Sequence, residues 1–115
     1  MIDLEKLSKE HEALFPNATA ESQFYKMEEE INEYFDACTE EQTIKELSDI
    51  VIVAAGLYRW FPQTAKAIAN DFTFGKMCLW EKIEAEVNRK WEVNKSRKWE
   101  WNGKTYKHVG KDGNE

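Results

Sequence analysis

Apolar side chains recur at helical spacing through most of the chain. The first stripe covers residues 2–14 and stops before a proline, and a second runs from about 19 to 37. A third occupies about 43–60 and becomes apolar nearly all round after Ile50, as in a helix buried on several sides. The pattern therefore predicts three helices in the first 60 residues.

The second half of the chain continues this pattern and then changes it. Residues 63–70 predict a short connecting helix, and Asn70 or Asp71 could cap a long fourth helix that continues past Trp91. After residue 98, aromatic and polar residues alternate around Asn102-Gly103, a dipeptide that suits a type I′ hairpin turn. A short two-stranded ribbon at the C-terminal end is expected.

These elements predict an all-α, four-helix-bundle-like unit with a short C-terminal tail or hairpin. We expect a single domain over residues 1–115, with a helical core at about 2–98 and a basic, aromatic tail at 99–115. The hydrophobic content of 42% excludes a disordered chain, and only 2 prolines and 5 glycines leave little loop material. Subunit association would help a domain of this size.

The sequence also bears on where the protein works. No apolar run approaches the roughly 20 residues that cross a bilayer, and the first 15 residues lack a signal-peptide pattern. Cys38 and Cys78 have no metal-ligand spacing and are too few for a disulfide framework, so both are expected to be reduced. We expect a cytoplasmic protein without a membrane partner.

Charge is distributed unevenly along the chain. Residues 1–58 hold 14 acidic and 4 basic side chains, a balance of -10, whereas residues 59–115 hold 8 acidic and 12 basic ones, a balance of +4. The first half could therefore bind a cation and the second an anion. An acidic half also repels phosphate backbones, which makes a nucleic-acid partner unlikely.

Two pairs of carboxylates stand three residues apart on the predicted second and third helices. Glu30 and Glu33 project together, as do Glu46 and Asp49, because residues three apart are neighbours on a helix surface. A solvated face would account for the first pair alone. The second pair lies next to an apolar part of the helix surface. Carboxylates held together in such surroundings usually have shifted pKa values or bind a cation. Four oxygen ligands from adjacent antiparallel helices would suit Mg²⁺ or Mn²⁺.

Basic and aromatic residues near the end of the fourth helix could bind a phosphorylated ligand. The cations can bind phosphate, an asparagine offers an amide, and tryptophans can stack on a base. Two simpler interpretations stay open: cations are favoured at any helix C-terminus, and tryptophans often anchor a core or a dimer. The residues concerned are Arg89, Lys90, Asn94, Lys95, Arg97 and Lys98, with Trp91, Trp99 and Trp101.

Other metal and phosphate motifs do not fit the sequence. Neither His11 nor His108 follows an acid by three residues, as a di-iron carboxylate bundle requires, so both histidines are expected to be structural or to contact substrate. The Gly-Lys-Thr at 103–105 lacks the first glycine of a P-loop and its strand-loop-helix setting.

Glu-x-x-Glu followed thirteen residues later by Glu-x-x-Asp resembles the signature of the MazG-like all-α nucleoside triphosphate pyrophosphohydrolases. The segments "FPNATAESQFYKMEEEINEY" and "EQTIKELSDIVIVAAGLYRW" resemble the core of small phage and prophage members, and "VNKSRKWEWNGKTYKHV" their tail. The resemblance covers roughly residues 14–109. It implies Mg²⁺-dependent hydrolysis of a (deoxy)nucleoside triphosphate to the monophosphate and pyrophosphate, with water attacking the α-phosphorus, by a homodimer or homotetramer.

The resemblance also implies roles for individual residues. The metal ligands would be Glu30, Glu33, Glu46 and Asp49, and either Glu29 or Glu33 would orient the attacking water. The expected substrate contacts are Lys95 and Arg97 on the phosphates, with Asn94, Gln23, Lys26 and Trp99. Two segments, "NRKW" and "NKSRKW", compete for this binding role, and the tail that follows the second favours it.

Two functions of other classes stay open on the sequence. A non-catalytic helical interaction protein, such as a small acidic phage factor that binds a host protein, would tolerate Gln or Asn at the four acidic positions. A nucleic-acid-binding module would use the basic tail, and its affinity would depend steeply on salt.

Overall fold

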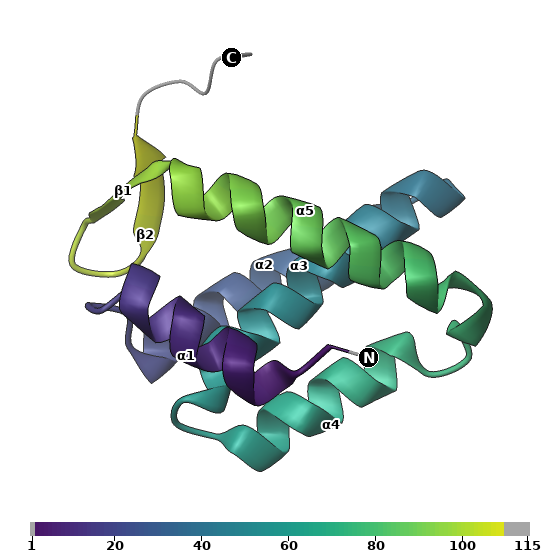
Figure 1. Ribbon diagram of the computed structural model, residues 1–115, viewed down its shortest axis with the longest axis horizontal. Helices are drawn as coiled ribbons and strands as arrows, with labels where there is room; N and C mark the ends of the chain where they lie inside the picture. The colour runs from purple at the N-terminus through teal and green to yellow at the C-terminus, as the bar shows by residue number, and fades with distance from the viewer. Residues whose placement is uncertain (1, 110–115) are drawn as a thin grey trace.

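The computed structural model describes residues 2–109 and places five α-helices, one 3₁₀ turn and a two-stranded hairpin in that range (Figure 1). In chain order the elements are α1 (Leu4–Leu14), α2 (Ala20–Asp36), α3 (Glu40–Tyr58), α4 (Pro62–Thr73), η1 (Met77–Leu79), α5 (Trp80–Ser96), β1 (Lys98–Trp101) and β2 (Tyr106–Val109). The expected all-α architecture with a C-terminal hairpin is confirmed.

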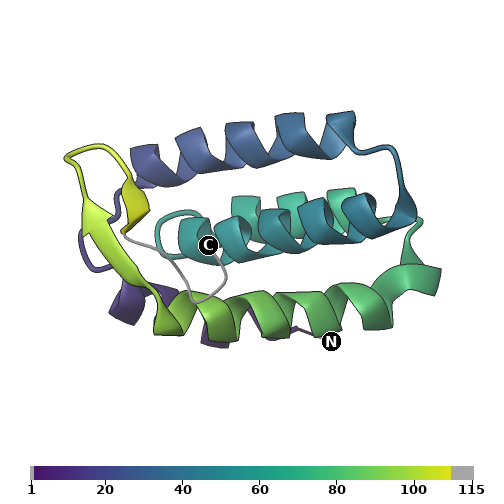
Figure 2. The same cartoon turned by 90° about the horizontal axis from the view of Figure 1, so that it is seen from above.

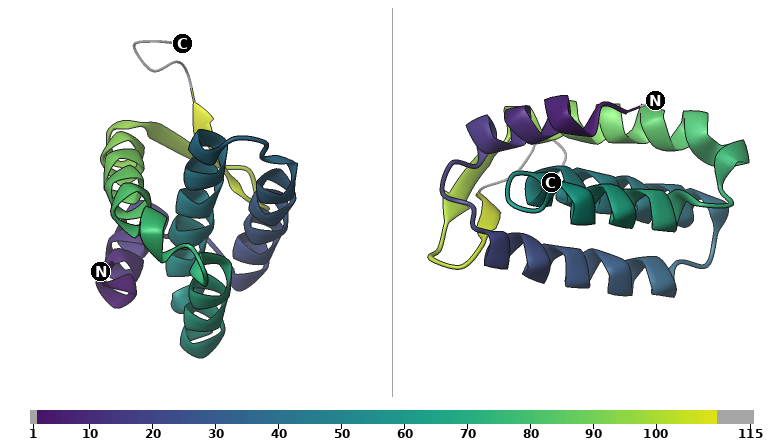
Figure 3. Two further views of the ribbon diagram at one scale, coloured as in Figure 1. Left: turned by 90° about the vertical axis from the view of Figure 1, so that its right-hand side faces the viewer. Right: turned by 90° about the horizontal axis from the view of Figure 1, so that it is seen from below.

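Helix α3 is the centre of the fold. It packs against α1, α2, α4 and α5, and its side chains at Leu47, Ala54, Ala55 and Leu57 have no exposed surface. Figure 2 shows α3 between α2 and α5, and the right-hand view of Figure 3 shows the same layers from below. Because α3 contacts neighbouring helices on every side, its sequence is apolar almost without interruption.

Side-chain caps fix where the first three helices begin. The Asp3 carboxylate accepts a hydrogen bond from the backbone N–H of Lys6 at 3.0 Å. Thr19 and Ser22 cap each other's backbone N–H groups reciprocally at the start of α2. The Thr39 hydroxyl oxygen accepts a hydrogen bond from the backbone N–H of Gln42, so α3 begins at Glu40, a few residues earlier than the apolar pattern indicates.

The predicted long fourth helix is wrong. Helix α4 extends to Thr73, so Asn70 and Asp71 lie inside it rather than capping a helix. Gly75 then takes a left-handed φ of +78°, which ends helical geometry, and α5 starts only at Trp80. The predicted helix spanned this break because Phe74 and Met77 fit the helical spacing of apolar residues. In the structure these two side chains are 84% and 71% exposed.

The hairpin packs on the end of α1 and has a different turn from the predicted one. A type I′ turn needs positive φ at both central residues, whereas only Gly103 has it, at +90°. The Asn102 side-chain oxygen instead accepts hydrogen bonds from the N–H groups of Lys104 and Thr105. The Phe15 ring lies 5.0 Å from the ring of Tyr106, which fixes the hairpin against α1.

The boundary between the helical core and the tail differs slightly from the predicted one. The helical part ends at Ser96, because β1 already begins at Lys98. Residues 110–115 of the predicted tail lie outside the described residues. Within residues 2–109 no helix is both long enough and apolar enough to cross a membrane.

Candidate functional site

Four carboxylates converge where α2 lies beside α3. Glu30 and Glu33 come from α2, and Glu46 and Asp49 come from α3. One oxygen of each lies within 4.8 Å of one oxygen of every other. The convergence predicted from the two three-residue spacings is therefore confirmed. We call these four residues the carboxylate cluster.

The connection between α2 and α3 explains this geometry. Only residues 37–39 separate the two helices, so the chain reverses directly and the helices run antiparallel along their length (Figure 2). Each pair spans about one turn and faces the neighbouring helix. Thr39 fixes the start of α3 and thereby the position of Glu46 two turns later. The cluster follows from a short loop, one cap and two i,i+3 pairs.

Burial and mutual repulsion make the ionised carboxylates of the cluster costly. Burial, and then the charges of Asp49 and Glu33, raise the pKa of Glu30 to about 8. Burial is also the largest cause of the raised pKa values of Glu46 and Asp49. The Oε2 atoms of Glu30 and Glu46 are buried without a hydrogen-bond partner. Buried acceptors without partners are rare in proteins, and a cation or bound water usually satisfies them.

Lys90 on α5 partly neutralises the cluster. Its Nζ atom lies 2.6 Å from Oδ1 of Asp49 and donates a second hydrogen bond to the backbone oxygen of Lys45. This ion pair opposes the effect of burial on the pKa of Asp49. The side chain of Lys90 is only 12% exposed, unlike that of most lysines. In the sequence Lys90 is only one of several basic residues, and no local pattern marks it as the partner of Asp49.

A cavity of about 260 Å³ adjoins the carboxylate cluster. Glu30 and Asp49 form one part of its wall. The rest of the wall comes from α1, α2, α3, the end of α5 and the hairpin, and five of the six predicted substrate contacts belong to it. These five are Gln23, Lys26, Asn94, Arg97 and Trp99.

Two residues named from the sequence lie elsewhere. The Nζ atom of Lys95 pairs with Oε1 of Glu92 at 2.8 Å, and Lys95 is not part of the cavity wall. Glu29 is exposed and pairs with Lys26 at 3.5 Å, outside the carboxylate cluster. Of the two candidates for orienting water, the structure thus brings only Glu33 to the other acids.

His11 is a wall residue that sequence analysis left without a definite role. It is buried, and its ring stacks on that of Trp91 with 5.9 Å between centroids. Burial, with a smaller effect of the Arg59 charge, lowers its pKa to about 4. His11 is therefore neutral at pH 7 and presents an uncharged imidazole to the cavity.

Gly56 provides the space that His11 and Gln23 occupy. A Cβ atom at position 56 would lie 2.7 Å from the His11 ring and overlap Oε1 of Gln23. We therefore expect Gly56→Ala to destabilise the fold by about 1–3 kcal/mol through overpacking. Helix propensity alone predicts the opposite sign, a gain of up to about 1 kcal/mol.

Urea unfolding of Gly56→Ala distinguishes these two effects. The matched control is Ala67→Gly, an exposed position on α4, where only propensity acts. An unfolding midpoint of Gly56→Ala equal to or above that of the wild type would contradict the close packing described for Gly56.

Comparison of the chain with protein-family models, with curated proteins and with solved structures finds no match. The functional interpretation therefore depends on the site itself.

Proposed function

We propose that this chain is a MazG-like pyrophosphohydrolase that converts a (deoxy)nucleoside triphosphate into the monophosphate and pyrophosphate. The observation that carries the proposal is the carboxylate cluster, which opens on a cavity with cationic and amide side chains in its wall. A nucleotide needs both parts: hard oxygen ligands for the metal that accompanies its phosphates, and donors for the phosphates and the base.

The cluster has the chemistry of a Mg²⁺ or Mn²⁺ site. All four donors are carboxylates, which these hard cations prefer, and the buried oxygens of Glu30 and Glu46 lack partners. Glu30, Glu33, Glu46 and Asp49 would hold the metal. When bound, Mg²⁺ neutralises phosphate charge and lowers the pKa of water.

The chain's own cations would bind and orient the triphosphate. Lys90 contacts Asp49 at the edge of the cavity, and Lys26 and Arg97 belong to the cavity wall. Phosphate oxygens entering here would exchange the carboxylate partner of Lys90 for a phosphate. Glu33 is the exposed member of the cluster, so its carboxylate can accept a hydrogen bond from the attacking water and direct it at the α-phosphorus.

Other residues of the cavity wall suit the nucleoside. The indole N–H of Trp99 donates a 2.8 Å hydrogen bond to the backbone oxygen of Asn94, which fixes the ring for stacking on a base. The Gln23 side chain offers an amide to the base edge, and His11 adds an uncharged imidazole. At about 260 Å³ the cavity is small for a whole triphosphate, whose phosphates would extend toward the carboxylate cluster.

The direct test is a panel of the eight common NTPs and dNTPs with Mg²⁺, in which chromatography detects monophosphate and pyrophosphate. Release of both products from at least one nucleotide, and its loss when EDTA removes the metal, is the expected result. A folded protein that turns over none of the eight would favour the alternative function, a non-catalytic helical interaction protein.

Lys90→Met is expected to lower kcat/KM about 10- to 100-fold, the usual effect of losing a hydrogen bond to a charged group. Lys82→Met is the matched control, because Lys82 lies on the same helix but is 62% exposed. Steady-state kinetics on the preferred nucleotide provide the measurement. Equal kcat/KM values for the two variants would exclude Lys90 from substrate binding.

We also propose that the chain self-associates, as a dimer or tetramer, through an aromatic face on α2 and at the start of α4. Phe24 and Phe61 contact each other at 5.8 Å and each remain 45% exposed, and Phe35 is 71% exposed. Exposed aromatic groups of this kind often mark protein interfaces. Light scattering should give a multiple of the 13.6 kDa chain mass, which Phe61→Glu should reduce. A monomeric wild type would contradict this proposal.

A further inference from the structure

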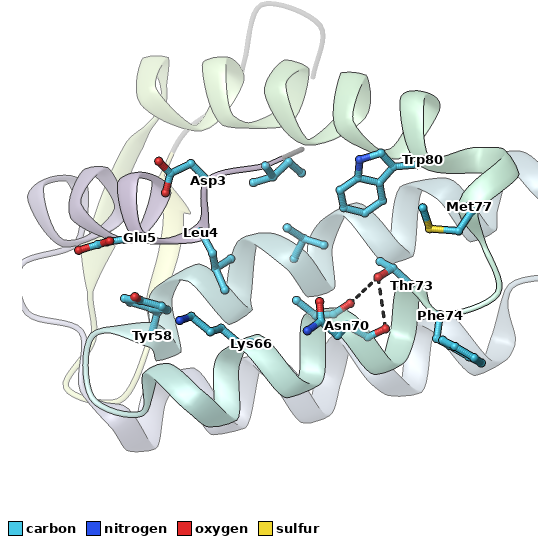
Figure 4. Close-up of a pocket in the computed structure, with 13 residues that line it drawn as sticks. Asp3, Leu4, Glu5, Tyr58, Lys66, Asn70, Thr73, Phe74, Met77 and Trp80 are labelled. Carbon is cyan, nitrogen blue, oxygen red and sulfur yellow. Dashed lines mark hydrogen bonds between the residues drawn. The ribbon is translucent and has the colours of Figure 1, made fainter.

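A second and larger cavity lies on the opposite side of α3 from the carboxylate cluster. It is a groove of about 630 Å³ between the start of α1, the length of α4 and the start of α5 (Figure 4). Val51 lines this groove, whereas Asp49 and Val53 line the candidate nucleotide cavity. Residues two apart on a helix point in nearly opposite directions, so α3 separates the two cavities. The proposed hydrolysis does not use this groove.

The floor and one wall of the groove are apolar. Val51 of α3 lines the groove. Leu4 projects into the groove from α1, and Trp80 faces it from the start of α5 (Figure 4). Leu4 and Trp80 are only partly buried, so part of their apolar surface remains in contact with solvent. A groove of this size and composition is typical of binding sites for small organic molecules.

The polar groups of the groove favour an anionic ligand. Lys66 and Asn70 stand four residues apart on α4 and thus on one face of it. Within residues 2–109 no acid pairs with Lys66, whose Nζ lies 5.8 Å from the centroid of the Tyr58 ring, and the Asn70 amide has no hydrogen-bond partner. The groove therefore offers a cation and an amide donor on one face of α4.

The two acids of the groove wall do not cancel this preference. The Asp3 carboxylate accepts the capping hydrogen bond from the Lys6 N–H and points away from the groove, and Glu5 projects outward at its far edge (Figure 4). Lys66 extends from α4 toward Tyr58, and among the described residues it is the one cationic side chain in the groove wall (Figure 4). An anionic group is thus the complement of the polar end, and an apolar or aromatic body is the complement of the other.

We propose that this groove binds a small amphipathic carboxylate. Its carboxylate would contact Lys66 and Asn70, and its apolar or aromatic body would lie over Val51 against Leu4 and Trp80. Such a ligand has one negatively charged group joined to a hydrocarbon group, which is either a flat ring system or a flexible chain. A neutral molecule of the same shape would lack the contact with Lys66.

Calorimetric titration with 2-naphthoate, and with 2-naphthamide as its neutral match, tests this proposal on the full chain. We expect saturable binding of 2-naphthoate at one site and weaker binding of the amide. Lys66→Met should weaken 2-naphthoate binding about fivefold, the modest effect of an exposed charge pair, and leave 2-naphthamide unchanged. Lys9→Met, at an exposed position on α1, is the matched control and should change neither.

A second variant, Ala69→Trp, fills the groove and should abolish binding of both compounds while circular dichroism and Tm show that the protein is folded. Three results would overturn the proposal: no binding by the wild type, equal affinity for both compounds, or unchanged binding by folded Ala69→Trp. A change from oligomer to monomer in Ala69→Trp would also overturn it, because a second copy of the chain would then occupy the groove.

Discussion

Replacing Glu46 by Gln is expected to abolish metal-dependent nucleotide hydrolysis and to stabilise the metal-free protein. Glu46 is one of four converging carboxylates, and its raised pKa reflects burial and interactions with other acids of the cluster. Loss of a metal ligand should lower kcat at least about a hundredfold, since changes even beyond the ligands cost 10- to 100-fold. Removing one charge should raise the free energy of unfolding by up to about 1 kcal/mol.

The opposite signs of these two effects make this variant informative. Glu29→Gln is the matched control, because Glu29 is an exposed acid on α2 next to Glu30 in the chain, yet it lies outside the carboxylate cluster and pairs with Lys26. Steady-state kinetics and urea unfolding should show a kcat and a stability near those of the wild type for Glu29→Gln. Full activity of folded Glu46→Gln would rule out the cluster as the metal site.

The second large effect concerns pH and Mg²⁺. Without a divalent cation, we expect the free energy of unfolding to fall as pH rises from about 6.5 to about 8. Glu30 has a pKa near 4.5 when solvated and about 8 in the folded protein. Over this range the unfolded chain has already lost that proton while the folded chain still holds it, so rising pH favours unfolding. Partial solvation screens the cluster, so the expected decrease in the free energy of unfolding is only about 1 kcal/mol.

The groups around Glu30 make the choice of pH range important. Glu33, Asp49 and Glu46 add negative charge there, and Lys90 supplies the opposing positive charge through Asp49. Below about 6.5, His11 acts in the other direction, because its lowered pKa makes the folded state lose stability as pH falls. Measurements above pH 6.5 therefore report the effect of the carboxylate cluster on stability without that of His11.

Mg²⁺ should reverse this loss. At a hundredfold excess over its Kd, a ligand that binds only the folded state adds about 2.7 kcal/mol, which corresponds to roughly 10 °C in Tm for a domain of this size. The shift should be larger at pH 8 than at pH 6.5, because the metal competes with the proton on Glu30. Thermal unfolding with NaCl at equal ionic strength is the control. Equal Tm values in Mg²⁺ and NaCl would contradict cation binding.

The candidate metal centre was largely predictable because its geometry is local. Three-residue spacing places Glu30 beside Glu33 on any helix, and the short connection at residues 37–39 brings the second pair opposite the first. The all-α architecture was predictable for the same reason, since one apolar stripe per helix is a property of the sequence itself.

Features that depend on single backbone positions or on tertiary contacts were not predictable in this way. Phe74 and Met77 continue an apolar pattern that the left-handed Gly75 interrupts. Asn102-Gly103 favours a type I′ turn, but the Asn102 side chain organises a longer loop. Lys90 pairs with Asp49 across 41 residues, and no local pattern distinguishes it from the exposed lysines of α5.

The measurement that tests the central claim most directly is hydrolysis of the preferred nucleotide in H₂¹⁸O with Mg²⁺, followed by mass spectrometry of both products. Attack of water at the α-phosphorus predicts one ¹⁸O atom in the nucleoside monophosphate and none in pyrophosphate. Label in pyrophosphate, release of inorganic phosphate instead, or no turnover of any of the eight nucleotides by the folded protein would contradict the proposed function.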